Sequence, residues 1–542
     1  MSRNSKSGIF GLLLPGIIVA LLFFFIALYL SACPWNFGDH TFWWIIIGSL
    51  AVFCMISFIR DDAGNRGFLS PWFYVITLLA PLVLWVILAT FSSKIINVGA
   101  YRSAVAINNS ELSSIEVLPN ITQADDLPIV DVVTAQRLGD RQMGQMEKYL
   151  SQYEVGDNYV FISYQGEYYR LAALEYGGFY KWFNSRNIGV PGYVLINVHT
   201  QEAKLVELEK GMKYVPSAYF GSDLKRHLKA SYPGIMFGDE LFEIDEDGTP
   251  FYIVSIMRPT ALLLGAKVQV GVALVNAITG ESSIYKNDEV PEWVDNVYSN
   301  NYLMSRLAWN YDLIHGVFNF SSRDIRKTSF SFDKSQYFEF ADQTGHVQVY
   351  TGITSAGKDE SNIGFVLMNK RTGNIDYFSS PGAEESSAQS SAKGLVQQYY
   401  YSAGPAMLVN VNSVETYFLT LKDAQLLVKK YAFVNKSDYN LVVVEDSVEL
   451  ALRAYSSKLS GLGIIDSTAF DTTGTIEMVA TAVESGNTIF IFRLVGYNQT
   501  FVSNIDINVE QSLFLTSGKN VNITFTKGET DDVLMVTSIS IE

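Results

Sequence analysis

Two short motifs in this chain of 542 residues have the residue types of phosphoryl-transfer chemistry. Asp471 opens the sequence Asp-Thr-Thr-Gly-Thr, in which an aspartate carboxylate could accept a phosphoryl group as a nucleophile. The stretch from Thr279 to Ser282 reads Thr-Gly-Glu-Ser and adds a second acidic residue. Because the chain also begins with long apolar segments, the first question is whether these features together make an ion pump.

The motifs resemble the phosphorylation motif D-K-T-G-T and the actuator motif T-G-E-S of the P-type ATPases, but the rest of the chain argues against that family. Thr472 takes the place of the lysine, and no G-D-G-x-N-D motif follows. Between Ser283 and Phe470 no segment approaches the ~18 consecutive apolar residues of a further membrane helix. We therefore expect both motifs to be structural, with Asp471 to Gly474 in the entry turn of a barrel and Thr279 to Ser282 in a hairpin.

Other candidate sites have the wrong spacing for catalysis or metal binding. A calcium loop starting at Glu243 would need a bidentate glutamate at its twelfth position, which is Val254, so a turn at Asp247-Gly248 is favoured. Glu384 and Glu385 open an expected helix, where acidic residues favour the positive N-terminal end. The sequence has neither a G-x-S-x-G motif nor a P-loop. Five histidines are scattered without a metal-binding pattern: His40, His199, His227, His315 and His346. We assign no catalytic, cofactor-binding or metal-binding residue from the sequence.

Charge and cysteine content restrict the remaining classes of function. Residues 1–102 hold six of the 39 basic residues and three of the 55 acidic ones, which leaves 33 and 52, a net charge of −19, for the rest. Such a charge repels phosphate backbones, so we expect no nucleic-acid partner. Cys33 and Cys54 are the only cysteines, so the region beyond them has neither a disulfide nor a thiolate metal site.

A repeated motif indicates the elements that hold these residues. Three segments begin with glycine and four apolar residues and continue with Asn, two variable residues and Thr, starting at Gly192, Gly271 and Gly364. The asparagines are Asn197, Asn276 and Asn369, at spacings of 79 and 93 residues, and the threonines are Thr200, Thr279 and Thr372. This pattern predicts a buried strand followed by a tight turn, in which Asn and Thr bond to nearby backbone. Gly280 and Gly373 can adopt positive φ at the turn, whereas Gln201 lacks that freedom and predicts a different turn.

The segments around each hairpin predict an α+β unit. Strands are expected upstream, from Thr249 and from His346, and helices downstream, each starting at a proline: Pro216, Pro291 and Pro381. The predicted order is strand, hairpin, proline and helix, which gives an antiparallel sheet covered by helices. A fourth, more divergent unit is expected between Leu408 and Leu459.

This unit resembles the PepSY type of domain, whose hairpin commonly reads apolar–Val–Asp–x–x–Thr–Gly–Glu. Val275 to Glu281 is the most similar copy, with Asn276 where aspartate is usual. The wider arrangement is similar to uncharacterised multi-pass membrane proteins of low-GC Gram-positive bacteria, on three stretches: Asp126–Asp140, Glu175–Val194 and Asp359–Gly373. The resemblance implies a large extracytoplasmic region with PepSY-like repeats but no known activity.

The N-terminal region predicts a three-helix membrane anchor. Its apolar runs are Ile9–Leu30, Phe42–Ile59 and Trp72–Phe91. Each has the ~20 residues that a helix needs to span a bilayer. Basic residues precede the first run and lie between the second and third, so the N-terminus is expected inside and everything after about residue 92 outside the cytoplasm. Leu30 to Cys33 resembles a lipobox, but the apolar run is longer than the ~7–15 residues of a signal peptide, which favours a retained helix.

The C-terminal segment predicts a small barrel. Three strands, a short helix and two further strands are expected between residues 466 and 542, which is the order of an OB-fold. Its acidic character argues against single-stranded nucleic acid as the ligand. The predicted domains are therefore an anchor (1–92), a linker with an amphipathic segment (93–155), PepSY-like α+β repeats (156–460) and the OB-like barrel (466–542).

These features together predict an extracytoplasmic, membrane-anchored binding or scaffold protein of a bacterial cell envelope. The expected partners are the membrane and an envelope protein, peptide or wall component, without a cofactor. Two alternatives stay open. The first is an envelope hydrolase or peptidase-regulating module that uses scattered acids with His199 or His227. The second is a subunit of a membrane complex whose helices carry the function.

Overall fold

The chain divides into two compact units. The computed structural model describes residues 3–63, 69–121, 127–145, 147–328, 337–355, 362–462, 470–484, 487–527 and 533–541. The first unit comprises Met1–Ser114 and Pro128–Glu384, and the second comprises Ile115–Leu127 and Glu385–Glu542.

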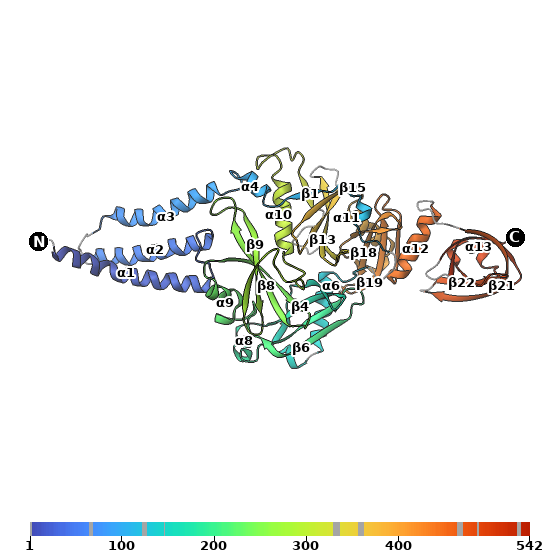
Figure 1. Cartoon of the computed structure of the whole chain (residues 1–542), viewed down its shortest axis with the longest axis horizontal. Helices are drawn as coiled ribbons and strands as arrows, with labels where there is room; N and C mark the ends of the chain where they lie inside the picture. The colour runs from blue at the N-terminus through green and yellow to red at the C-terminus, as the bar shows by residue number, and fades with distance from the viewer. Residues whose placement is uncertain are drawn as a thin grey trace. The chain divides into compact units, whose positions relative to one another are not determined.

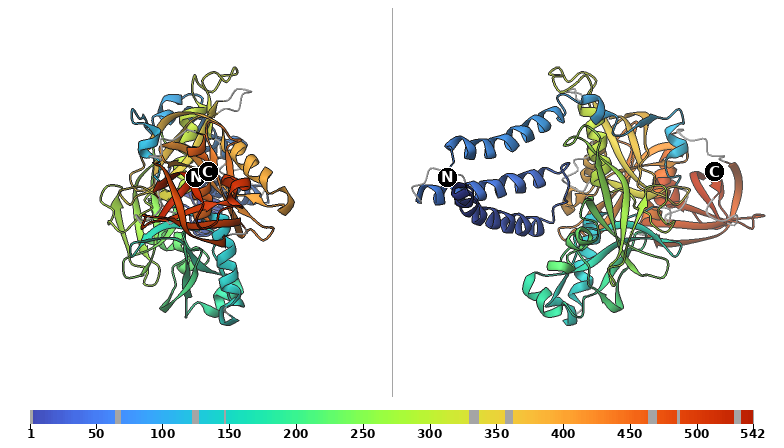
Figure 2. Two further views of the ribbon diagram at one scale, coloured as in Figure 1. Left: turned by 90° about the vertical axis from the view of Figure 1, so that its right-hand side faces the viewer. Right: turned by 60° about the vertical axis from the view of Figure 1, so that its left-hand side comes forward.

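Three apolar helices open the first unit: α1 (Arg3–Leu30), α2 (His40–Ala63) and α3 (Pro71–Phe91). Each is long and apolar enough to cross a membrane, as the sequence predicts. The helices extend side by side away from the sheets of this unit (Figures 1 and 2). Gly16 permits a close approach of α1 to α2, because a Cβ at this position would lie 2.5 Å from Ser57 Oγ. Cys33, just beyond α1, is buried with Leu28 and Phe42 where α1 and α2 meet.

Three modules, each a largely antiparallel sheet against which one helix packs, follow in the same unit. In the first module α6 (Val132–Gly144) packs on the sheet β2-β4-β5-β6, in which β3 also pairs with β4. In the second, α9 (Leu224–Ser231) lies against the sheet β10-β9-β8-β7, and in the third, α10 (Asn300–Asp312) packs on β13, β14 and β15. The strands are β2 (Tyr153–Val155), β3 (Val160–Tyr164), β4 (Glu167–Tyr176), β5 (Val190–Asn197), β6 (Ala203–Met212), β7 (Met236–Ile244), β8 (Pro250–Pro259), β9 (Lys267–Asn276), β10 (Ser282–Lys286), β11 (Arg326–Thr328), β12 (Phe338–Ala341), β13 (Val347–Ser355), β14 (Asn362–Asn369) and β15 (Ile375–Gly382).

Each helix belongs to the sheet that follows it in the chain, so the predicted order, with the helix at the end of its unit, is wrong. The reason is that the backbone entering each helix hydrogen bonds to the residue after the hairpin asparagine of the next sheet. These bonds run from Ile129 N to Val198 O (2.8 Å), from Tyr214 N to Ala277 O (3.0 Å) and from Tyr298 N to Lys370 O (2.8 Å).

The three prolines do not begin the helices, and this prediction is also wrong. α9 begins after Asp223, which accepts a hydrogen bond from Arg226 N at 2.9 Å, and α10 begins after Ser299, which accepts one from Tyr302 N at 3.0 Å. Pro381 lies inside β15, and α11 begins later, at Glu385. Capping side chains fix these starts, because they satisfy first-turn N–H groups that otherwise have no partner.

The repeated hairpin has the same geometry in all three copies. At the β9–β10 turn the Asn276 side chain accepts hydrogen bonds from Ile278 N (3.0 Å) and Thr279 N (2.9 Å), and Gly280 N donates to Asn276 O at 2.9 Å. The predicted difference in the first copy is wrong, because Gln201 adopts a φ of +63° and donates to Asn197 O at 3.1 Å. The hydrogen bonds of the turn thus hold Gln201 in the left-handed conformation that Gly280 (φ +77°) adopts freely.

The second unit begins with a fourth sheet, in the region where the sequence predicts a divergent repeat. Here α11 (Glu385–Leu395) and α12 (Val448–Gly461) contact β19, and Asn435 accepts hydrogen bonds from Ser437 N and Asp438 N, both at 2.9 Å, as the other hairpin asparagines do. The sheet order is β16-β18-β19-β20, with β17 paired to β18. The strands are β16 (Ser402–Ala403), β17 (Met407–Val411), β18 (Val414–Lys422), β19 (Val428–Asn435) and β20 (Val442–Glu445).

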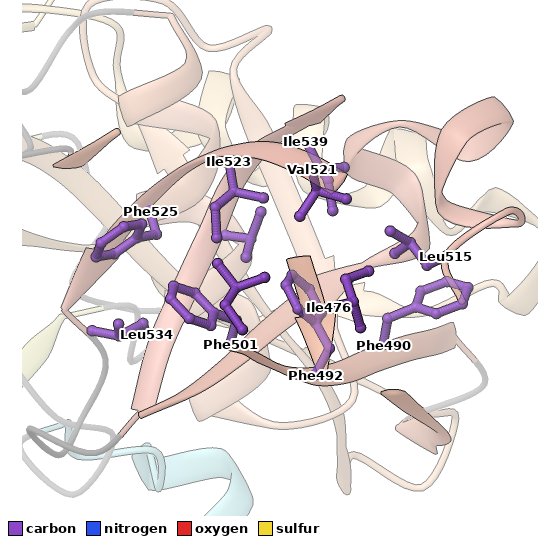
Figure 3. Packing of buried hydrophobic residues seen from close by; sticks show 12 residues of the cluster. Ile476, Phe490, Phe492, Phe501, Leu515, Val521, Ile523, Phe525, Leu534 and Ile539 are labelled. Carbon is purple, nitrogen blue, oxygen red and sulfur yellow. The ribbon is translucent and has the colours of Figure 1, made fainter. Parts of the chain in front are cut away.

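A closed barrel of five strands ends the second unit, in the order β21-β22-β23-β25-β24. The predicted sequence of three strands, a short helix and two strands is confirmed, with α13 (Val509–Ser512) between β23 and β24. Aromatic and aliphatic side chains fill the interior of the barrel (Figure 3). Phe501 is fully buried, and its ring centre lies 5.6 Å from that of Phe492 and 5.2 Å from that of Phe525. The strands are β21 (Phe470–Glu484), β22 (Asn487–Leu494), β23 (Thr500–Asn504), β24 (Asn520–Lys527) and β25 (Val533–Ile541).

The segment predicted as a linker, 93–155, contributes to two of the sheets. β1 (Ile107–Asn109) pairs in parallel with β15, and α6 packs on the first sheet. The remaining short helices of the first unit and its boundary are α4 (Val98–Arg102), α5 (Ser114–Val117), α7 (Glu147–Leu150) and α8 (Phe179–Ser185).

Candidate functional site

The two motifs with possible phosphoryl chemistry are both structural. Thr279 to Ser282 forms the β9–β10 turn, as predicted. The expected entry turn at Asp471 to Gly474 is wrong, because these residues lie inside β21, with Asp471 paired to Thr524 of β24. Alternate threonines of this motif bond across the strands, since Thr473 Oγ1 donates to Asn522 Oδ1 and Thr475 Oγ1 donates to Asn520 Oδ1 at 2.6 Å. A long paired strand holds the motif because its β-branched threonines suit a sheet surface.

The other sequence candidates also have structural roles. Asp245 closes the β7–β8 turn, where its side chain accepts hydrogen bonds from Asp247 N (3.1 Å) and Thr249 N (2.8 Å). His227 Nε2 lies 2.7 Å from Gly280 O and its ring is 4.3 Å from that of Tyr214, so it packs at the hairpin turn. Glu385 lies in the first turn of α11, as predicted for the acidic pair.

The structure instead has a cleft of about 660 Å³ beside the C-terminal end of α10. Its volume lies within the ~300–1,000 Å³ of small-molecule sites. Hydrophobic side chains and several polar groups from α4, β1, α10, β11 and the ends of β13 and β14 line it: Arg102, Ile107, Asn109, Asn310, Tyr311, Ile314, Asp324, Ile325, Arg326, Ser355 and Ile363.

Two arginines give the cleft its positive character. Arg102 Nε donates to Asn310 O at 3.3 Å, and Asn310 Nδ2 donates back to Arg102 O at 3.3 Å. The guanidinium carbon of Arg326 lies 4.5 Å from the ring centre of Tyr377, which holds the side chain by a cation–π contact. The cleft carboxylate Asp324 is bound by His315 Nε2 at 2.7 Å and by Arg323 Nε at 3.5 Å. His315, then Arg323 and then Arg326 lower the pKa of Asp324, but among the described residues neither Arg102 nor Arg326 forms a salt bridge. With two arginines against one carboxylate in its lining, the cleft can receive an anionic group.

A buried ion cluster joins the first and third modules. Glu339 of β12 accepts hydrogen bonds from the Arg170 guanidinium of β4, from Lys370 Nζ at 2.8 Å and from Asn300 Nδ2 at 2.9 Å. The side chains of Arg170, Glu339 and Lys370 are at most 2% exposed. Burial by itself would raise the pKa of Glu339, but Lys370 and Arg170 more than offset this and lower it to about 2. Glu339 therefore stays ionised at neutral pH.

An acidic pair, Glu243 and Asp295, lies where the first and second modules meet. Glu243 of β7 is 1% exposed and accepts hydrogen bonds from Asn296 N (2.8 Å) and Asp295 N (3.0 Å), while Asp295 Oδ2 accepts one from Ser163 N at 2.6 Å. Burial, and then the negative charge of Asp295, raise the pKa of Glu243 to about 8. Burial also raises the pKa of Asp295, to about 6. The pair favours a protonated Glu243 in the folded chain near neutral pH.

Sequence reasoning missed the cleft and both buried clusters. One signal was present for the ion cluster, because the residue after the hairpin asparagine is apolar in two copies, Val198 and Ala277, and is Lys370 in the third. A lysine at a position predicted to be buried requires a carboxylate partner. The cleft arginines had no such signal, since Arg102 and Arg326 lie in unrelated segments that only the tertiary fold brings together.

Comparison of the sequence with protein-family models gave no match, and no curated protein matches it either.

Proposed function

We propose that the chain is a membrane-anchored binding or scaffold protein of a bacterial cell envelope, and that the cleft beside α10 binds an anionic group of its partner. The cleft carries the proposal, because two arginines without a salt-bridge partner in the described chain line a pocket of ligand size. Guanidinium groups bind carboxylate and phosphate by paired hydrogen bonds. The partner would be an envelope protein, an acidic peptide or an anionic wall component.

The modules and the barrel fit this function as small interaction domains. Repetition of a helix and an antiparallel sheet with one hairpin geometry supports a PepSY-like identity for the repeats, and the barrel order β21-β22-β23-β25-β24 supports an OB-like one. The similarity to extracytoplasmic regions of Gram-positive membrane proteins belongs to the same proposal.

The proposed orientation has the N-terminus in the cytoplasm and the chain after about residue 92 outside. The distribution of basic residues around the three helices supports it. Protease treatment of intact cells tests the orientation, and fragments of the region beyond residue 100 are expected. Complete protection of that region in intact cells, with digestion in lysed cells, would place it inside and overturn the orientation.

Site-specific photo-crosslinking in cells tests the binding role of the cleft. A photoreactive residue at Asn109, which is exposed in the cleft, should capture a defined partner, whereas the same residue at Ile284 on the edge strand β10 should not. The double substitution Arg102→Gln and Arg326→Gln should abolish the adduct, and the surface substitution Lys286→Gln should leave it intact. An adduct of equal yield in the double variant would refute anion binding by the cleft.

A hydrolytic function is the second candidate, on one observation. His315 Nε2 lies 2.7 Å from Asp324 Oδ2 at the edge of the cleft, which is a geometry in which a carboxylate could orient a base. In the part of the chain that the structure describes, His315 has no hydrogen bond to a hydroxyl or thiol nucleophile. Turnover of a captured partner by the wild type but not by His315→Gln would favour the enzyme over the binding protein. A role for α1–α3 within a larger membrane complex stays the third proposal.

A further inference from the structure

An exposed group of aromatic rings lies on α8 and on the short turn Phe220–Ser222 that precedes α9. Phe179, Tyr180, Phe183 and Phe220, named here the aromatic shelf, are 39%, 82%, 48% and 54% exposed. Phe179 lies at ring-centre distances of 5.7 Å from Tyr180, 6.2 Å from Phe183 and 6.3 Å from Phe220, so the four rings form one surface. Contiguous apolar surface of this kind is rare on a soluble protein and marks a contact site.

One residue of the aromatic shelf, Phe220, has an unfavourable backbone conformation. Phe220 has a φ of +55°, a conformation that bulky residues rarely adopt. Beneath it Trp182 is buried, with ring-centre distances of 5.7 Å to Phe220 and 5.5 Å to Tyr219. An exposed phenylalanine kept in a strained conformation above a packed tryptophan points to a function for its position.

The shelf lies close to the end of the first apolar helix. Arg226 of α9 donates from Nε to Tyr29 O at 3.2 Å and from Nη2 to Leu30 O at 3.0 Å, which are the last carbonyls of α1. The six peptide units between Phe220 and Arg226 span at most ~20 Å even when fully extended. Trp35 N also donates to Pro233 O at 2.8 Å, so the loop after α1 is bound just beyond α9. α9 is accordingly seen at the end of α1, with α8 next to it on the side away from α2 (Figure 1).

Two further loops with exposed apolar side chains are tied to the end of α3. Leu262, 59% exposed at a φ of +54°, lies in a loop whose Leu264 N donates to Ser92 Oγ at 3.2 Å. Phe318 and Phe320, 66% and 89% exposed, follow Leu313, which is packed against Tyr101 of α4. In the described part of the first unit beyond the membrane helices and the loops next to them, the exposed large apolar residues outside these segments are Ile188, just after α8, and the isolated Leu112, Leu150 and Ile284. The exposed apolar surface of the first unit is thus concentrated in segments tied to the ends of the membrane helices.

We propose that the aromatic shelf, together with Leu262 and the Phe318–Phe320 loop, lies in the interface of the lipid bilayer, so that the first unit rests on the membrane surface. Phenylalanine and leucine side chains of surface-bound segments are buried at the boundary between headgroups and acyl chains, and tyrosine is enriched at the depth of the headgroups. The occupant is lipid rather than a protein because the surface continues directly from the ends of the spanning helices. Arg186, just after α8, with its guanidinium carbon 4.0 Å from the Phe183 ring centre, is placed to contact lipid phosphates.

Electron paramagnetic resonance of the full chain in lipid nanodiscs tests this placement. Nitroxide labels on Tyr180→Cys and Phe220→Cys should collide more often with oxygen, which concentrates in lipid, than with a water-soluble nickel chelate. A label on Leu112→Cys, an exposed apolar site in the segment between β1 and α5, should show the reverse. The unsubstituted chain gives the labelling background, because Cys33 and Cys54 are buried.

The outcome distinguishes lipid from other occupants of the shelf. If the labels at 180 and 220 collide with the nickel chelate as freely as the label at 112, the shelf faces water and the proposal is overturned. That result would leave the shelf open to a protein partner. Equal thermal unfolding of the three labelled variants and the unsubstituted chain shows that the labels report the native position.

Discussion

Replacing Glu339 by glutamine should destabilise the first unit more than any comparable surface substitution. The substitution keeps the size of the side chain but removes the only charge that Arg170 and Lys370 share within the cluster. Both cations would then be buried, each 2% exposed, without the carboxylate that both contact. Breaking a buried ion pair in this way costs ~3–5 kcal/mol. At ~2–4 °C per kcal/mol, the unfolding temperature should fall by about 6–20 °C.

The assay is thermal unfolding of the full chain in nanodiscs, followed by tryptophan fluorescence at pH 7. The matched control is Glu289→Gln, which removes a glutamate carboxylate from the exposed Lys286. The ion-pair distances are almost equal, 2.7 Å between Lys286 Nζ and Glu289 and 2.8 Å between Lys370 Nζ and Glu339. The control should leave the unfolding temperature unchanged, because an exposed pair is screened by water.

A second substitution separates charge from packing. Lys370→Met in the Glu339→Gln background removes one of the unpaired cations, so the double variant should recover part of the loss. The reasoning is refuted if Glu339→Gln unfolds within about 2 °C of the unsubstituted chain, or if adding Lys370→Met makes the chain less stable by the full sum of the two effects.

Three further predictions concern other parts of the fold. The pKa of Glu243 is raised from its ordinary 4.5 to about 8 in the folded chain, so its contribution to folding stability is complete below pH 4.5 and is lost as the pH rises toward 8. The unfolding temperature should therefore fall between pH 4.5 and 8, and Glu243→Gln should make it depend less on pH over this range. Gly280→Ala should lower stability by about 1–3 kcal/mol in chemical denaturation, because a Cβ would lie 2.5 Å from the Tyr214 ring at a φ of +77°, whereas Gln201→Gly should raise it by about 0.5–1 kcal/mol. Phe501→Ala should cost the barrel ~3–5 kcal/mol, seen as faster hydrogen exchange in β21–β25, and unchanged exchange would contradict the packing in Figure 3.

The sequence by itself determined the elements whose signal is local. The three apolar helices follow from runs of apolar residues that no soluble fold can bury in succession. The hairpins at Asn197, Asn276 and Asn369 follow from side chains that bond to their own turn. The strand and helix order of the barrel follows from alternation and β-branched content. In each of these elements the interactions that decide the structure lie within a few residues of one another.

Only the tertiary structure decided which helix covers which sheet and how the cleft and the ion cluster assemble. Arg102 and Arg326 are brought to one cleft because β1 joins a sheet whose other strands lie far along the chain. Arg170 and Glu339 meet because two modules pack together, and their burial requires each to pair with the other. Nothing local distinguishes these residues from solvated surface charges, since their partners come from distant segments. The sequence therefore determined the modules, and the packing between them placed the charges that we expect to carry binding and stability.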